Sequence, residues 1–244
     1  MKIVAIIEAR TGSSRLPGKV LLECNNKSMI ERLLIRLQSV DLFDDIIVAT
    51  TKNSLDDRFV ELLNSLGIKY FRGDEENVFD RVIKCAEFTG AQVIVEISGD
   101  CPIIDPKIIK EMIKLFLSTD VDYLSNCETP TYPLGMAVEI ISLEALKKSY
   151  SMTTSKLDRE HVTLHIRKNP SIFKILNVTA PENLYHPELS VTLDEPSDFT
   201  VISNVIHYLE PLDSLFDCEQ IINFLIENPQ IAKLNSSVIR KGDT

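Results

Sequence analysis

The sequence lacks a long apolar run, a closely spaced pair of cysteines and an excess of basic residues. No stretch approaches the roughly 20 apolar residues of a membrane span, so a membrane partner is not expected. The five cysteines are scattered and odd in number, which argues against a disulfide framework and against a zinc site. Asp and Glu (36) outnumber Lys and Arg (26), and the net charge of -10 argues against nonspecific nucleic-acid binding.

The N-terminal run lacks the features of a signal peptide. Residues 1–10 read MKIVAIIEAR, in which Glu8 and Arg10 interrupt the apolar run and no small-residue cleavage site appears. We therefore expect a first core strand and, together with the dispersed cysteines, a cytoplasmic protein.

Short apolar runs alternate with segments of helical periodicity over the first 125 residues. The predicted strands are 3–7, 46–50, 68–71, 92–97 and 121–125, and the predicted helices are 28–39, 56–66, 76–89 and 106–117. Runs such as 46–50 are continuous enough to be buried on both faces of a sheet. Strands that alternate with helices predict an α/β fold with a doubly wound, mostly parallel sheet.

The pattern changes after residue 125. The predicted elements there are strands at 136–141, 173–178 and 190–194 and helices at 143–150, 157–168, 196–209 and 217–227. No internal repeat or low-complexity linker interrupts the chain, so we expect a single domain over 1–244 that carries an inserted region. The last dozen residues, which include Ser236, Ser237 and Gly242, are expected to be poorly tied down.

Residues 8–19, EARTGSSRLPGK, gather cations, hydroxyls and glycines directly after the first strand. The cations are Arg10, Arg15 and Lys19, the hydroxyls are Thr11, Ser13 and Ser14, and the glycines are Gly12 and Gly18. Glycines let backbone N–H groups approach a ligand, and the cations neutralise phosphate oxygens by charge-assisted hydrogen bonds. This turn therefore predicts a polyphosphate site, and the alternative is a basic surface loop.

Two common phosphate loops do not match this turn. A Walker A loop has four residues between its glycines and a hydroxyl residue after its lysine, whereas Gly12 and Gly18 are separated by five residues and Val20 follows Lys19. A dinucleotide fingerprint is excluded because Ser14 and Pro17 stand where its second and third glycines would be.

Two carboxylates are placed to bind the Mg²⁺ that a triphosphate requires. Asp100 follows the strand at 92–97 through Gly99, and Asp194 ends the run 190–193, so each stands at a strand exit. Mg²⁺ is usually bound by one or two carboxylates together with phosphate oxygens and waters. Asp194 and Asp198 could also be helix-cap residues, and for Asp198 we favour that role.

Five ordered motifs resemble the SpsF-like cytidylyltransferases, which are related to CMP-KDO and CMP-acylneuraminate synthetases. The resemblance runs from Lys2 to about Phe199. The motifs are ARTGSSRLPGK at 9–19, GDCPIID at 99–105, YPLGMAVE at 132–139, DREHVT at 158–163 and LDEPSD at 193–198.

The resemblance implies a nucleotidyltransferase (Rossmann-like) fold in which residues 1–125 bind the nucleotide and an inserted region at about 126–190 binds the acceptor. The implied reaction joins CMP from CTP to an acceptor, such as an acidic sugar or a related surface-polysaccharide precursor, and releases pyrophosphate with Mg²⁺ as cofactor. A homodimer with a surface in 126–178 is also expected from the resemblance.

The same resemblance, with the turn residues above, gives a set of expected site residues. Catalytic roles fall to Arg10, Arg15, Lys19 and Asp100, and metal binding to Asp100 and Asp194. The expected nucleotide contacts are Ala9, Arg10, Gly12, Ser13, Arg15, Lys19, Arg72, Arg81 and Gly99. The expected acceptor contacts are Tyr132, Gly135, Glu139, Glu160 and His161.

One position departs from the family pattern. Glu8 stands where these relatives more usually carry Gln or Pro, and a carboxylate there would repel phosphate unless it turns away or meets the amino group of the base. The contact with the base is therefore open, while the phosphate loop is unaffected.

Other functions stay open on the sequence alone. The chain could use another nucleoside triphosphate on a sugar phosphate, or it could be a noncatalytic nucleotide-binding protein of a glycan pathway. A glycosyltransferase would need an Asp-x-Asp pair at a strand exit, but Asp120 and Asp122 open a predicted strand. His161 and His165 lie four apart on a predicted helix, a spacing that can bind zinc, but no third ligand is evident.

Overall fold

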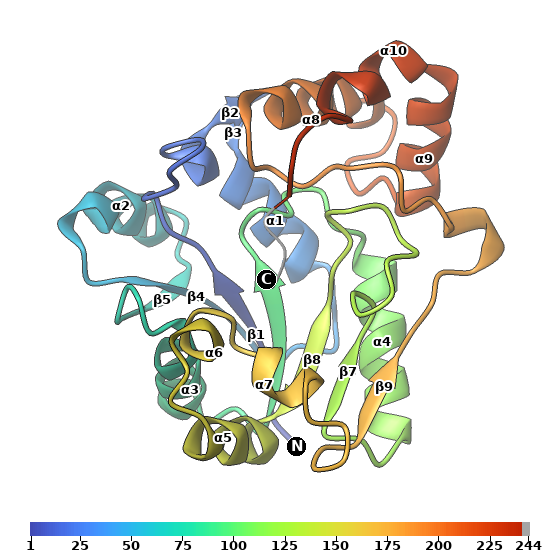
Figure 1. The fold of residues 1–244 in the computed structure, drawn as a ribbon. Helices are drawn as coiled ribbons and strands as arrows, with labels where there is room; N and C mark the ends of the chain where they lie inside the picture. The colour runs from blue at the N-terminus through green and yellow to red at the C-terminus, as the bar shows by residue number, and fades with distance from the viewer. Residues whose placement is uncertain (241–244) are drawn as a thin grey trace.

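A computed structural model describes residues 1–240, and its centre is one mixed sheet of seven strands (Figure 1). The strand order is β5–β4–β1–β6–β8–β7–β9. The strands are β1 (Ile3–Glu8), β4 (Asp45–Thr51), β5 (Lys69–Gly73), β6 (Val93–Ser98), β7 (Tyr123–Ser125), β8 (Glu139–Ser142) and β9 (Ile175–Asn177). The adjacent strands β5, β4, β1 and β6 run parallel to one another. Strand β8 is antiparallel to β6 and β7, and β9 is parallel to β7.

Helices cover both faces of this sheet (Figure 1). On one face lie α1 (Met29–Gln38), α2 (Asp57–Ser65), α4 (Pro106–Ser118), α8 (Pro196–Leu209) and α9 (Cys218–Glu227). On the other lie α3 (Val78–Thr89), α5 (Leu143–Met152), α6 (Lys156–Glu160) and α7 (Leu164–Arg167), and α10 (Pro229–Ala232) follows α9. The doubly wound, mostly parallel α/β fold expected from the sequence is confirmed.

The alternation of side chains along β1 shows how the sequence produces two cores. Val4 and Ile6 belong to the apolar cluster under α3 and α5, whereas Ile3 and Ile7 belong to the cluster under α1 and α4. Each strand residue points to the face opposite its neighbour, so a continuous apolar run fills both clusters. The edge of the sheet at the carboxyl ends of β1 and β6 is left for polar residues.

Side-chain caps set where several helices begin. The Ser28 hydroxyl accepts a hydrogen bond from the Glu31 amide at the start of α1, and Asp105 caps α4 just before Pro106. At α8, Glu195 and Asp198 form a reciprocal capping box. The cap role favoured for Asp198 is therefore confirmed.

A small hairpin precedes α1 and was not predicted. It joins β2 (Glu23–Cys24) to β3 (Lys27–Ser28) through Asn25 and Asn26, whose φ angles are 47° and 59°. Two consecutive positive φ angles are required by the tight turns that match strand twist, and asparagine tolerates them better than most residues.

Three predictions beyond residue 125 are wrong. The helix expected at 157–168 is two short helices, α6 and α7, because His161 adopts extended backbone angles. The run 190–194 is not a strand of the sheet, and only Ser190 forms an isolated bridge, with Leu134. His161 and His165 therefore do not share one helix.

The third error concerns the chain end. Residues 233–240 dock on the rest of the molecule, since Asn235 is buried and Arg240 forms ion pairs with Asp194 and Asp198. Ser236 and Ser237 are exposed between these two anchoring residues, while Gly242 lies outside the described residues. Within residues 1–240, no helix has the length and apolarity that crossing a membrane requires.

Candidate active site

The cationic turn after β1 is closed by its own backbone and anchored by a buried carboxylate. The Thr11 carbonyl accepts hydrogen bonds from the amides of Ser13 and Gly18, both at 2.9 Å, and Gly18 has a φ of 70°. The Thr11 amide and hydroxyl both donate to Asp56 at 2.7 Å. The turn is thus a preorganised loop whose side chains project from a fixed backbone.

These side chains face a cleft of about 340 Å³ at the carboxyl ends of β1 and β6. Eleven of the expected site residues line it: Ala9, Arg10, Gly12, Ser13, Arg15, Lys19, Arg81, Asp100, Glu160, His161 and Asp194. Glu8, Ser14, Val78 and Ser98 line it as well. Residues from five separate parts of the sequence therefore meet in the place where open α/β sheets bind ligands.

The ammonium of Lys19 lies between the two carboxylates expected to bind metal. Its Nζ is 2.7 Å from Asp100 Oδ2 and 3.1 Å from Asp194 Oδ1, and its side chain is only 10% exposed. Arg15 also reaches Asp194, at 3.0 Å. Two carboxylates therefore converge on one cation position, and the Arg15 guanidinium beside it could bind a polyphosphate.

Asp194 reaches Asp100 because the segment before it is hydrogen-bonded along two loops. The Val191 amide donates to the Leu134 carbonyl at 2.7 Å, and the Leu193 amide donates to the Asp100 carbonyl at 2.8 Å. Gly135 makes the first contact possible, because a Cβ there would lie 2.7 Å from the Val191 carbonyl carbon. The run 190–193 acts as a connector that delivers Asp194 to the cleft.

A glycine brings β1 and β6 together at the floor of the cleft. The Gly99 amide donates to the Glu8 carbonyl at 2.8 Å, and a Cβ on Gly99 would lie 2.8 Å from the Cβ of Ala9. Gly99 is therefore required for this close approach. Burial raises the pKa of Asp100, against the attraction of Lys19, so its carboxylate needs a cation partner to remain ionised.

Buried carboxyl groups continue the floor toward β8. Glu96 of β6 lies beside Glu8 and is paired in register with Glu139 of β8. Burial raises the pKa of Glu8, although the positive charge of Arg81 opposes this increase. Burial also raises the pKa of Glu96, and the neighbouring carboxylates of Glu8 and Glu139 raise it further. Arg81 is 3% exposed and donates to the Asp74 carbonyl at 2.6 Å.

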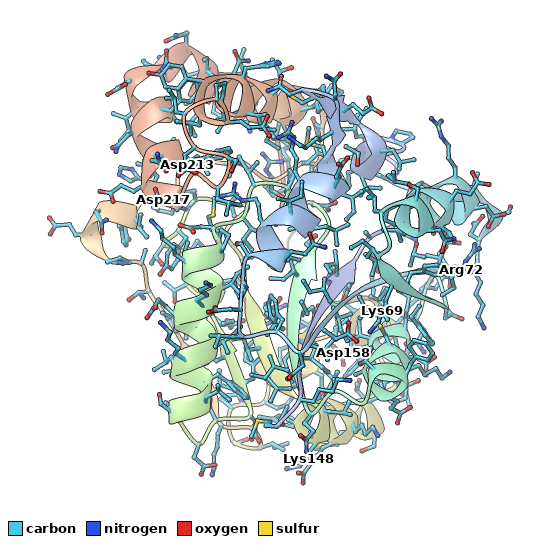
Figure 2. All side chains as sticks on the ribbon, turned by 180° about the vertical axis from the view of Figure 1, so that it is seen from behind. Lys69, Arg72, Lys148, Asp158, Asp213 and Asp217 are labelled. Carbon is cyan, nitrogen blue, oxygen red and sulfur yellow. The ribbon has the colours of Figure 1, made fainter. Side chains whose placement is uncertain are left out.

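Five expected site residues do not line the cleft, and one of them is Gly99, which supports its floor. Arg72 lies beside α2 (Figure 2), where its guanidinium donates to the carbonyls of Thr51 and Asn53 and to Asp57. Tyr132 lines a different groove of about 760 Å³ beside α4. Gly135 supports the connector, and Glu139 accepts a hydrogen bond from the Tyr123 hydroxyl at 2.5 Å.

Several supporting residues were missed by the sequence analysis. Asp56 holds the Thr11 backbone, Glu75 pairs with Arg10 at 3.1 Å, and Arg240 reaches Asp194 at 3.4 Å. Asp56 stands directly before α2, at its N-cap position, and in the sequence such an Asp is typical of an ordinary helix cap. For Arg240 the sequence carries no signal, because its partners lie more than 40 residues earlier.

A mostly parallel α/β sheet with a cationic first turn, one carboxylate at a strand exit (Asp100) and a second delivered by the connector (Asp194) defines a nucleotidyltransferase-type enzyme. Within residues 1–240, no group of three or more His, Cys, Asp or Glu side chains is placed to hold a metal ion by itself. A pair of carboxylates instead fits Mg²⁺, which takes its remaining ligands from phosphates and water.

Comparison with known proteins gives the particular family. The chain belongs to the cytidylyltransferase family, whose model matches residues 4–230. It is 40% identical over 242 residues to the protein MJ1063 of Methanocaldococcus jannaschii, covering 99% of this chain and 98% of that one. It is 29% identical over 240 residues to the spore coat polysaccharide biosynthesis protein SpsF of Bacillus subtilis, covering 94% and 96%.

Two further comparisons agree. A 115-residue part is 36% identical to 3-deoxy-manno-octulosonate cytidylyltransferase of Geobacter sulfurreducens, covering 46% of this chain and 44% of that one. The structure of a cytidylyltransferase from Leptospira borgpetersenii superposes with a TM-score of 0.91 at 29% identity, covering 99% and 100%. The resemblance to SpsF-like cytidylyltransferases, and their kinship with CMP-KDO synthetases, is confirmed.

Proposed function

We propose that this enzyme transfers CMP from CTP to an oxygen of a surface-polysaccharide precursor, such as an acidic sugar, and releases pyrophosphate. The observation that carries the proposal is the convergence of Asp100 and Asp194 on the Lys19 ammonium, at 2.7 and 3.1 Å. This places a cation position next to a loop rich in positive charge. The name of the SpsF relative supports the choice of a polysaccharide precursor.

One group of cleft residues would bind the phosphates of CTP, and another would bind the acceptor. Arg15 and Lys19 lie on the Asp194 side, where they would neutralise the β- and γ-phosphates and the departing pyrophosphate. Glu160 and His161, at the end of α6, line the cleft on the side toward α3, where the acceptor would bind. The acceptor oxygen would attack the α-phosphorus in line with the leaving group, so the enzyme acts by positioning and by charge stabilisation.

Asp100 and Asp194 are the residues that would hold Mg²⁺. The fit rests on their donor type, since hard oxygen ligands suit Mg²⁺, and on their shared approach to one positive charge. When bound, Mg²⁺ would neutralise charge on the phosphate oxygens. Lys19 would then move its contact from the carboxylates to the triphosphate.

The first test is a thermal-shift panel of CTP, GTP, UTP and ATP, each with Mg²⁺ or with EDTA. A ligand at 100 times its dissociation constant stabilises the folded state by about 2.7 kcal/mol, so we expect a clear rise in melting temperature for CTP with Mg²⁺. Asp100→Asn should remove the part that depends on Mg²⁺. A shift for another nucleotide alone would contradict the use of CTP.

Pyrophosphate release tests turnover directly. With CTP, Mg²⁺ and a panel of acidic and neutral sugars, we expect release only with the true acceptor. Tight CTP binding without release for any acceptor would favour a noncatalytic role.

The setting of the enzyme is also a proposal. The five free thiols support a reducing, cytoplasmic compartment. We propose a homodimer on the basis of the family resemblance, and analytical ultracentrifugation of the apoenzyme tests it.

A further inference from the structure

The chain end returns to the catalytic cleft. After α10, the described part of the C-terminal segment runs back toward the carboxyl end of β6 (Figure 1). Asn235 is buried there, and its side-chain amide donates to Asp198 Oδ1 at 2.8 Å and to the Ser190 carbonyl at 3.1 Å. Farther along, the Ile239 carbonyl accepts a hydrogen bond from Arg15 at 3.3 Å.

Arg240 forms a bidentate ion pair with Asp198 through both terminal nitrogens of its guanidinium. Its Nη1 lies 2.8 Å from Asp198 Oδ2 and its Nη2 lies 2.6 Å from Asp198 Oδ1. Nη2 also donates to the Ser190 hydroxyl at 2.8 Å, and Nη1 lies 3.4 Å from Asp194 Oδ2. This bidentate arrangement fixes orientation as well as charge.

Asp198 links Arg240 to the backbone beside the expected metal ligand Asp194. Its Oδ2 accepts hydrogen bonds from the amides of Asp194 at 3.0 Å and Glu195 at 2.8 Å. Its side chain is fully buried, so its charge must be balanced by partners. Arg240 therefore sits behind Asp194, bound to the carboxylate that holds the Asp194 amide.

Three cations contact Asp194, and they differ in how they are held. Lys19 and Arg15 line the cleft and can turn toward a triphosphate, whereas Arg240 is fixed by two contacts with Asp198. When the first two engage phosphate, Arg240 is the cation that stays behind Asp194 and keeps its carboxylate oriented.

We propose that the C-terminal segment 235–240 is part of the nucleotide site and that Arg240 is a positioning residue, which orients Asp194 for the metal–triphosphate complex. This inference rests on the proposed function of the cleft. The segment 235–240 lies outside the five sequence motifs, the last of which ends at Asp198.

The test compares Arg240→Ala and Arg240→Lys with wild type by calorimetric titration of CTP, in EDTA and in Mg²⁺. Residues that orient a metal ligand typically contribute 10- to 100-fold to metal affinity or activity, so Arg240→Ala should weaken CTP binding at least 10-fold in Mg²⁺. Binding in EDTA should change less than threefold, and Arg240→Lys should recover part of the loss. Lys69→Ala, which removes an ion pair with Asp45 on β4, is the control and should bind as wild type.

The outcomes separate the inference from the proposed function. Equal binding by wild type and Arg240→Ala in Mg²⁺ would overturn the inference alone. An equal loss in EDTA and in Mg²⁺ would also overturn it, because Arg240 would then act on CTP directly. Absence of CTP binding by wild type would overturn the proposed function and the inference together.

A second variant covers the case in which Arg240→Ala does not fold. Asp198→Asn combined with Arg240→Ala removes the buried negative charge together with its partner, and it should restore the melting temperature. If positioning is the role of Arg240, this double variant still loses the Mg²⁺-dependent part of CTP binding. Normal Mg²⁺-dependent binding by the double variant would show that Arg240 only balances charge, and would overturn the proposal.

Discussion

Glu8 closes β1 at the edge of the cleft, and its surroundings explain how a carboxyl group is tolerated beside a phosphate loop. Its Oε1 is buried and has no hydrogen-bond partner among the described residues, and its neighbour is the carboxyl group of Glu96. Burial raises the pKa of Glu8, against the attraction of Arg81. A protonated Glu8 carries no charge and can donate a hydrogen bond, as a glutamine at this position could.

Glu8→Gln should therefore stabilise the enzyme above neutral pH. At pH 8 a carboxylate at this position costs free energy that the amide avoids, and we expect a gain of about 1 kcal/mol, or about 2–4 °C in melting temperature. At pH 4.5 the gain should disappear, because Glu8 is protonated. Thermal unfolding of both proteins at the two pH values checks this, and a lower melting temperature for the variant at pH 8 would show that Arg81 stabilises the carboxylate.

At this scale the sequence predicts the residues whose chemistry is local. Arg15, Lys19 and Asp100 lie in short motifs, because a strand exit and the turn after it are contiguous in the chain. Asp56 and Arg240 could not be predicted, since their contacts join segments far apart in sequence and carry no spacing pattern.

At the scale of elements, the connector 190–193 shows how an irregular segment can position a side chain of the cleft, that of Asp194. It lies between the loop at Leu134 and the carbonyl of Asp100, and it leads through Asp194 and Glu195 into α8. The prediction of a strand here was wrong because alternating apolar residues also suit a segment that pairs at one position only. The turn at Gly135, with a φ of 106°, allows the backbones to meet.

Gly135→Ala should destabilise the enzyme by more than about 2 kcal/mol, because it combines an unfavourable φ with a Cβ that meets backbone at 2.7 Å. Gly67→Ala is the matched control, since Gly67 also has a positive φ but no atom within 4 Å of the added Cβ, and it should cost about 1 kcal/mol. Urea unfolding of both variants gives the comparison. Equal costs would contradict the close approach of Gly135 and Val191.

At the scale of the whole molecule, carboxyl groups fall into two sets with opposite pH dependence. In the first set, burial would raise the pKa of each carboxyl, but hydrogen bonds lower it by more: this holds for Asp56, Asp198 and Asp217. For Glu210, burial likewise acts upward, and hydrogen bonds from Arg32 and Asn25 lower the pKa to about 2. Burial raises the pKa of Glu8, Glu96, Asp100 and Asp105. The first set supports packing and caps, whereas the second, apart from Asp105, lies at the carboxyl ends of the central strands.

The two sets predict a stability maximum at about pH 5 for the protein without nucleotide or metal. A carboxyl with a lowered pKa stabilises above its unfolded pKa and loses that contribution as pH falls through the folded value. A carboxyl with a raised pKa is most favourable below its unfolded pKa, and its contribution is lost as pH rises through the folded value. Urea midpoints between pH 2 and 8 measure the fall in stability on the acid side of the maximum (the acid limb) and on its alkaline side (the alkaline limb). A midpoint that still rises from pH 6 to 8 would contradict the raised pKa values of the second set.

Single substitutions assign each limb to its cause. Glu210→Gln should lower stability at pH 5 by about 2 kcal/mol and flatten the acid limb, because the amide no longer gains from ionisation beside Arg32. Glu96→Gln should leave the acid limb unchanged and flatten the alkaline one. If CTP and Mg²⁺ bind as proposed, they should raise the alkaline limb of the wild type, since the bound cation favours the ionised form of Asp100. The central strand ends would then hold charges that burial opposes and that the substrate complex stabilises.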